Sequence, residues 1–205
     1  MSRSQDPPEK DRFPAYPRPR GARRVNGKIA VLGLGNVLVG DDGAGPVVVR
    51  TLAAQWRFTP GVAVEDLGTP GLDLVPHVSG CERVVFVDTV RTGSPAGSVV
   101  LLDRERLLAA PPPVRVSPHD PGLAEVLLTL RFEGGEPRDV RLVGIEPRSL
   151  ATGVGLSPEV RRAVPRACRR ICDVLRGWGV VAERRDPPED PDLWWLADAG
   201  KGEER

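Results

Sequence analysis

Short, nearly continuous apolar runs alternate with amphipathic stretches through most of this chain, and that alternation restricts the fold more than any other feature. Strands covered on both faces have such apolar runs, and strands joined by crossover helices pair in parallel. The sequence therefore predicts an α/β domain. The predicted strands are residues 28–34, 62–68, 83–88, 97–103 and 140–145. The predicted helices are residues 43–57, 71–80, 121–132 and 158–178.

The domain is predicted to occupy residues 28–182 and to be flanked by two tails. A chain of 205 residues with 40% apolar composition can bury one sizeable core. Residues 1–27 are basic and rich in proline and arginine, so we expect a flexible tail. Residues 183–205 are acidic and have the composition of a solvated, disordered tail. Trp194 and Trp195 leave open that this second tail docks onto the domain or a partner.

Composition argues against nucleic acid or a membrane as a partner. The formal net charge is +1 at pH 7, so no overall field attracts the chain to phosphates or acidic lipids. No stretch approaches the roughly 20 apolar residues that span a bilayer, and the N-terminus lacks the apolar segment of a secretory signal. The odd set of cysteines, Cys81, Cys168 and Cys172, does not suggest a disulfide framework. We therefore expect a cytoplasmic protein with reduced thiols.

The glycine-rich stretch GLGNVLVGDDGAGPVVV follows the first predicted strand but does not fit a nucleotide cradle. Gly33 and Gly35 match the dinucleotide pattern G-x-G-x-x-G, whereas Leu38 occupies its third position. The carboxylates of Asp41 and Asp42 would repel a phosphate at the helix start. One aspartate suffices to cap a helix, and the end of a buried strand is where α/β folds place ligand-binding groups. At least one of these aspartates is therefore a candidate functional residue.

Two more residues, Asp88 and His119, have side chains that can bind a metal ion. Asp88 ends the strand predicted at residues 83–88, and an acid there is costly to bury unless it is paired, metal-bound or facing a cleft. His119 lies between prolines just before a predicted helix, in a loop with restricted backbone. A salt bridge or turn for Asp88, and a local hydrogen bond for His119, remain alternatives. Together with Asp41 or Asp42 from the loop after the first predicted strand, Asp88 and His119 would provide oxygen and nitrogen ligands, a combination suited to nickel or zinc.

Conventional nucleophile sites are missing from the sequence. There is no G-x-S-x-G elbow. Cys168 and Cys172 lie one helical turn apart, as expected of residues on a packed helix face. Cys81 has no activating neighbour in sequence except Arg83. If the chain is a hydrolase, carboxylates and a metal ion must explain the chemistry.

Five segments in order resemble the [NiFe]-hydrogenase maturation endopeptidases over residues 28–182: GLGNVLVGDDGAG, DLGTPG, VVFVDTV, SPHDPGLAEVL and VRLVGIEP. Members of that family trim the C-terminal extension from the hydrogenase large-subunit precursor after nickel has been installed. The resemblance implies a three-layer α/β/α sandwich around a five-stranded, twisted, mainly parallel sheet with one antiparallel strand. It also implies an aspartic-type endopeptidase whose partner is that precursor.

The resemblance places the family's catalytic and nickel-recognising residues on Asp42, Asp88 and His119. It assigns Asp41 and residues 66–69 to support of the loop, although Asp41 could substitute for Asp42 as the ligand. The nickel would be supplied by the precursor rather than be resident in the enzyme. Two rivals stay open: a nickel-sensing metallochaperone without protease activity, and a small-peptide hydrolase that carries its own zinc.

Overall fold

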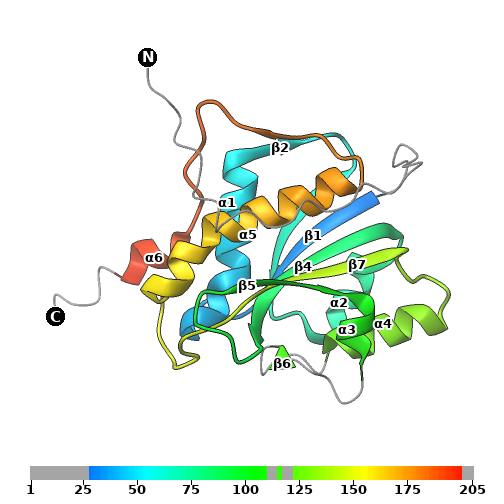
Figure 1. The fold of residues 1–205 in the computed structure, drawn as a ribbon, viewed down its shortest axis with the longest axis horizontal. Coiled ribbons are helices and arrows are strands. Elements are labelled where there is room, and N and C mark those ends of the chain that lie inside the picture. Colours follow the sequence, from blue (N-terminus) through cyan, green and yellow to red (C-terminus); the bar gives the residue numbers. More distant parts are fainter. Residues whose placement is uncertain (1–27, 110–114, 117–121, 200–205) are drawn as a thin grey trace.

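The computed structural model describes residues 28–109, 115–116 and 122–199, and a twisted five-stranded sheet lies at its centre (Figure 1). In sheet order, the strands are β3 (Val62–Gly68), β1 (Lys28–Leu34), β4 (Cys81–Arg91), β7 (Asp139–Ile145) and β5 (Val99–Asp103). All neighbours pair in parallel except β5, which is antiparallel to β7. The short β6 (Arg115–Val116) pairs with the end of β4. This topology confirms the predicted α/β sheet.

Helices cover both faces of the sheet, so the domain has three layers (Figure 1). One face packs against α1 (Ala44–Gln55) and α5 (Pro158–Gly177). The other packs against α2 (Leu74–Val78), α3 (Arg104–Leu108) and α4 (Gly122–Phe132). Side chains of a strand alternate between faces, and accordingly Ile29 and Val31 of β1 belong to the first core whereas Ala30 and Leu32 belong to the second.

The glycines around α1 allow this helix to lie close to the sheet. A Cβ on Gly45 would lie 2.1 Å from the carbonyl oxygen of Leu34 in β1 and 2.4 Å from that of Val87 in β4. Any side chain at Gly45 would therefore push α1 away from the two strands. Within the described ranges, the 3-10 turns are η2 (Gly40–Gly43), which leads directly into α1, and η3 (Gly71–Asp73), which precedes α2.

Several element boundaries differ from the sequence-based prediction. The helix predicted at residues 43–57 ends at Gln55, because the next residues form β2 (Trp56–Phe58) and pair with β8 (Ala182–Arg184). Trp56 and Phe58 gain packing against the first core in that strand. β4 continues to Arg91, where it pairs with β6. The short helices α3 and α6 (Trp194–Ala199) were not predicted.

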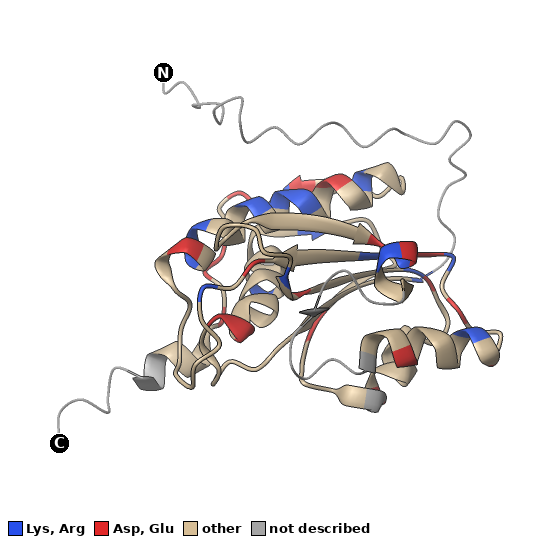
Figure 2. Cartoon of the chain, turned by 60° about the horizontal axis from the view of Figure 1, so that its bottom comes forward, with Lys and Arg blue, Asp and Glu red and all other residues tan. Residues whose placement is uncertain are grey.

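The end of the described chain folds back onto the domain. Trp195 of α6 is 5% exposed and belongs to the core between the sheet and the helices α1 and α5. The sequence left open whether this tail docks onto the domain or onto a partner, and Trp195 docks onto the domain. Acidic and basic residues are spread over several elements, with a run of basic positions along α5 (Figure 2). None of the helices within the described ranges is long and apolar enough to cross a membrane.

Candidate active site at the ends of β1 and β4

The carboxyl ends of β1 and β4 meet at one edge of the sheet and bring two of the predicted site residues together. The two strands are parallel neighbours, with Gly33 opposite Val87. Asp42 lies in η2 after β1, and Asp88 lies within β4. A Cβ on Gly35 would lie 1.9 Å from the main-chain oxygen of Asp42 and 3.6 Å from Oδ1 of Asp88. The loop that carries Asp42 therefore packs directly against Asp88.

Thr89 holds both carboxylates. Its hydroxyl donates to Asp42 Oδ1 at 3.3 Å, and its amide donates to Asp88 Oδ1 at 2.6 Å. Asp42 Oδ2 also accepts the amide of Asn36 at 2.8 Å. Asp42 is 0% exposed and Asp88 2% exposed. The site is therefore a buried pair of acids whose oxygens are oriented by hydrogen-bond donors of the two strand ends.

Asp41 differs from its neighbour in what it binds. It is 1% exposed. Its Oδ2 accepts the amides of Arg148 at 2.8 Å and Ser149 at 3.0 Å, and the hydroxyl of Ser157 at 3.0 Å. Its Oδ1 accepts the amide of Ser157 at 2.6 Å. Both oxygens thus fix the connection between β7 and α5, and Ser157 in turn caps α5. This arrangement is that of a structural acid.

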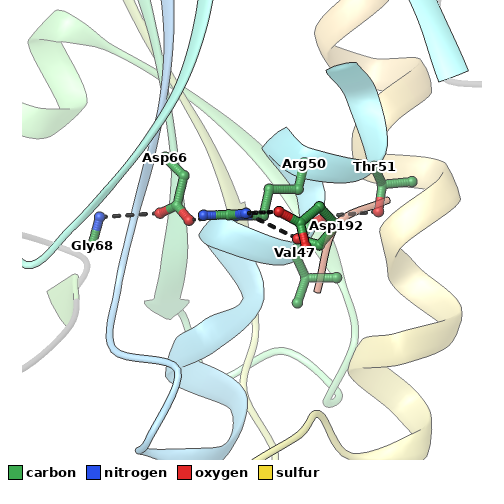
Figure 3. Close-up of polar contacts among 6 residues, drawn as sticks. All are labelled: Val47, Arg50, Thr51, Asp66, Gly68 and Asp192. Atoms are coloured by element: carbon green, nitrogen blue, oxygen red, sulfur yellow. Dashed lines mark hydrogen bonds and ion pairs between the residues drawn. The ribbon is translucent and has the colours of Figure 1, made fainter. Parts of the chain in front are cut away.

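The end of β3 supports the loop after β1. Asp66 Oδ1 accepts the amide of Gly68 at 3.1 Å, and the carbonyl of Gly68 accepts the amide of Gly35 at 2.8 Å. The guanidinium of Arg50 in α1 donates to Asp66 Oδ2 at 2.8 Å and reaches Asp192 on its other side, as Figure 3 shows. These hydrogen bonds join the end of β3 to the loop that precedes Asp42.

A cavity opens over these loops. It has a volume of about 350 Å³ and is lined in part by Gly35, Asn36, Asp66 and Thr69. Asp42 and Asp88 do not line this cavity. Asn36, whose amide donates to Asp42, does line it, as does Gly35, which lies next to Asp88. The cavity therefore reaches the residues that adjoin the buried pair.

Sequence reasoning did not assign two further polar residues at this edge, Thr89 and Glu146. Glu146 directly follows β7 and is 6% exposed. Its Oε2 accepts both the amide and the hydroxyl of Thr92, each at 2.7 Å, and so holds the turn after β4. An acid directly after an apolar strand was the signal that singled out Asp88, and the same signal is present in the segment VRLVGIEP.

The third predicted ligand, His119, lies outside the described residues. Within the described ranges, no group of three or more His, Cys, Asp or Glu residues could hold a metal ion. The cysteines offer no reactive nucleophile, because all three are buried and free. Burial raises the pKa of Cys168 and of Cys172 to about 12 and also raises the pKa of Cys81.

The sequence of this chain is similar to sequences of known proteins. A sequence model of the family described as hydrogenase maturation protease matches residues 46–174. The chain is 32% identical over 163 residues to the hydrogenase 2 maturation protease of Escherichia coli strain K12, covering 80% of this chain and 99% of that protein. It is 34% identical over 152 residues to the hydrogenase expression/formation protein HoxM of Cupriavidus necator, covering 74% of this chain and 75% of that one.

Solved structures show the same fold. The hydrogenase maturating endopeptidase HybD from E. coli superposes with a TM-score of 0.73 at 33% identity, covering 78% of this chain and 99% of that one. The [NiFe] hydrogenase maturation protease HybD from Thermococcus kodakarensis superposes with a TM-score of 0.59 at 29% identity, covering 72% of this chain and 98% of that one. Both likenesses extend over nearly the whole of the compared structures.

Proposed function

The chain belongs to the hydrogenase maturation proteases, a family of peptidases, and from that premise we propose that it removes the C-terminal extension of a [NiFe]-hydrogenase large-subunit precursor after nickel insertion. The observation that carries the proposal is the convergence of Asp42 and Asp88 on Thr89 at the edge of the sheet. The three free cysteines fit a reducing compartment, so we place the reaction in the cytoplasm.

The nickel ion belongs to the substrate in this proposal. Asp42 and Asp88 supply carboxylate oxygens, and His119, from outside the described residues, supplies an imidazole nitrogen. Oxygen and nitrogen donors of this kind suit a borderline divalent ion such as nickel. Because both carboxylates are buried, the surface over them must open before the precursor's ion can reach them. A precursor without nickel provides no ligand to stabilise the opened site and stays uncut.

Asp42 rather than Asp41 is the first-loop ligand. The oxygens of Asp41 accept three amides and a hydroxyl from the connection between β7 and α5, and releasing them would leave these buried donors unpaired. Asp42 instead accepts the amide of Asn36, two residues after β1, and the hydroxyl of Thr89 in β4. A ligand bound by Asp42 is therefore beside Asp88 as well.

We assign peptide hydrolysis to a carboxylate and a water molecule, which makes the enzyme aspartic-type. One carboxylate takes a proton from water as the water oxygen attacks the scissile carbonyl carbon. The carbon–nitrogen bond then breaks, and the leaving amine receives the proton that the carboxylate took from water, which returns the carboxylate to its starting state. The raised pKa values of Cys168 and Cys172 keep these thiols protonated and speak against a cysteine nucleophile.

The test incubates the purified protein with a large-subunit precursor prepared with and without nickel, and follows the precursor's mass. We expect loss of the C-terminal extension only from the nickel-loaded form. Asp42→Asn, Asp88→Asn and His119→Ala should each slow cleavage of the nickel-loaded form. Loss of the carboxylate that takes the proton should slow it by about 10²–10⁴-fold, the usual effect of removing an acid–base group. Glu105→Gln is the matched control, because Glu105 is an exposed carboxylate on α3.

The same assay separates the rival functions. Failure to cut either form while binding the nickel-loaded one identifies a metallochaperone. Cleavage of small peptides with a stoichiometric zinc retained through purification identifies a zinc hydrolase. Near-normal cleavage by a folded Asp88→Asn variant removes Asp88 from the proposed chemistry.

A further inference from the structure

Residues 192–196, called the C-terminal segment below, are brought beside the candidate site by a stretch of chain that runs back along α1. The amide of Arg185 donates to the carbonyl of Gln55 at 2.8 Å, and the amide of Glu189 donates to that of Ala54 at 3.1 Å. Both acceptors lie at the end of α1. From there the chain descends beside α1 to α6, at the red end of the ribbon in Figure 1. Arg185, Glu189 and the C-terminal segment lie beyond the family match, which ends at residue 174.

Arg50 fixes the C-terminal segment to the domain. Its Nη1 donates to the main-chain oxygen of Asp192 at 2.9 Å, and its guanidinium carbon lies 5.1 Å from the centre of the Trp195 ring. The same guanidinium donates to Asp66 Oδ2 at 2.8 Å (Figure 3). One cation in α1 therefore binds both the C-terminal segment and the end of β3 that supports Gly35, so the segment has a defined position relative to the site.

Two cavities lie on either side of Trp195. The larger, of about 350 Å³, has Gly35 and Asn36 at one end and Trp194 in its wall. The smaller, of about 220 Å³, is mainly apolar and is lined in part by Leu156 and Leu196. Trp195 and Val37 line both cavities. The C-terminal segment and the loop after β1 thus form the shared boundary of the two cavities.

Exposed apolar side chains gather around this boundary. Among the described residues, four of the seven large hydrophobic side chains that are exposed lie here: Leu38, Val154, Trp194 and Leu196. The carbonyl of Leu38 accepts the amide of Gly153 at 2.9 Å, and Leu196 lies 3.7 Å from the position of a Cβ on Gly155. Apolar side chains gathered around a cavity are typical of a surface that binds a protein.

We propose that the C-terminal segment is a specificity-determining wall of the peptide cleft, and that Trp194 and Leu196 contact the precursor next to its scissile bond. The inference rests on the proposed function, because the occupant must reach Asp42 and Asp88 through the larger cavity. The precursor's chain lies extended along the boundary, with one apolar side chain in the smaller cavity. A folded precursor brings a wide surface with its tail, and that surface covers the exposed apolar side chains.

The test compares steady-state cleavage of a nickel-loaded large-subunit precursor from the same organism by the full-length wild type and by Trp194→Ala. Trp194 is 57% exposed, so its removal leaves the core intact. We expect KM to rise about tenfold and kcat to change less than twofold, because a large aromatic side chain at an interface contributes binding rather than chemistry. Phe132→Ala is the matched control, since Phe132 is a 95% exposed aromatic side chain on α4.

Leu196→Ala, also on an exposed position, should raise KM in the same direction. Unchanged KM in both variants overturns the inference while cleavage by the wild type leaves the proposed function standing. A higher kcat/KM in Trp194→Ala overturns it as well, since the segment would then obstruct the cleft. If the wild type cuts no nickel-loaded precursor, the inference fails together with the proposed function.

Discussion

Replacing Asp41 by asparagine tests whether this acid is structural, in contrast to its neighbour Asp42. The carboxylate accepts four hydrogen bonds, three from amides and one from the hydroxyl of Ser157, while only 1% exposed. Asparagine has the same shape but only one acceptor oxygen, and its amide nitrogen is a donor. In the better orientation, the oxygen keeps the three bonds on the Oδ2 side, and the nitrogen faces the amide of Ser157.

The expected loss of stability follows from these contacts. Facing the Ser157 amide with another donor leaves a buried N–H unsatisfied, which costs about 1–3 kcal/mol. The three remaining bonds lose the strength that comes from a charged acceptor, about half of each bond. Relief from burying a charge offsets part of this. We therefore expect the free energy of unfolding to fall by about 3 kcal/mol, and Tm by roughly 6–12 °C for a domain of this size.

The measurement is equilibrium urea unfolding followed by circular dichroism, with the midpoint and the slope m fitted together. Asp190→Asn serves as the control, because Asp190 is exposed, and surface substitutions of this kind stay within about 0.5 kcal/mol of the wild type. A free energy of unfolding for Asp41→Asn that equals the control would refute the reasoning, since the four contacts would then stabilise nothing.

Three further predictions concern the surroundings of the acid pair. Gly35→Ala should destabilise the domain by several kcal/mol and abolish processing, because the new Cβ would lie 1.9 Å from the main-chain oxygen of Asp42. Gly134→Ala is the control: Gly134 also has a positive φ, but no atom lies within 4 Å of the new Cβ. Its free energy of unfolding in urea should fall by only about 1 kcal/mol. Thr89→Val should lower the free energy of unfolding by about 1 kcal/mol and also lower kcat, because the hydrogen bond from the hydroxyl to Asp42 is lost while that from the amide to Asp88 remains. Thr89→Ser should restore kcat. An unchanged kcat in Thr89→Val contradicts the orienting role. Cys168 and Cys172 should resist iodoacetamide at pH 8 until the protein is unfolded, and rapid labelling of the native protein contradicts their burial. The free energy of unfolding should also fall as pH rises from about 9 to about 12, because the pKa of these thiols is near 9 in the unfolded chain and about 12 in the folded one.

The sheet could be predicted from the sequence because its strands are buried on both faces. Such strands are apolar at nearly every position, so each central strand appears as a continuous run. The same property hides strand direction: the segment VVLLD of β5 has the pattern of its parallel neighbours although it runs antiparallel to β7. Helix α5 was predicted to within one residue of its end, because Ser157 and Pro158 mark its start. Helices α3 and α6, of five and six residues, are too short for a period to be recognised.

The meeting of Asp42 and Asp88 could be predicted for the same topological reason. Neighbouring parallel strands end at the same edge, so acids that follow or end them lie close together. The division of roles between Asp41 and Asp42 could not. In a 3-10 turn successive side chains point about 120° apart, and nothing in the pair DD says which direction faces β4. The partners of Asp41 are 107 to 116 residues away in sequence, at the connection between β7 and α5.

The tail predicted at residues 183–205 shows how far composition can predict order. Its many acids and prolines make it resemble a solvated chain, and most of its described side chains are indeed exposed. Two local contacts oppose that tendency. One is the burial of the Trp195 indole, worth up to a few kcal/mol. The other is Arg50 of α1, which lies over that ring and donates to the main-chain oxygen of Asp192. Neither contact can be predicted from the sequence without knowing that Arg50 lies on the face of α1 beside Asp66. Arg50 also binds Asp66 at the end of β3, and this end of β3 holds Gly35 in the loop before Asp42. A change in the position of the C-terminal segment would therefore be transmitted to the cleft, and substitutions of Arg50 should alter precursor binding and stability together.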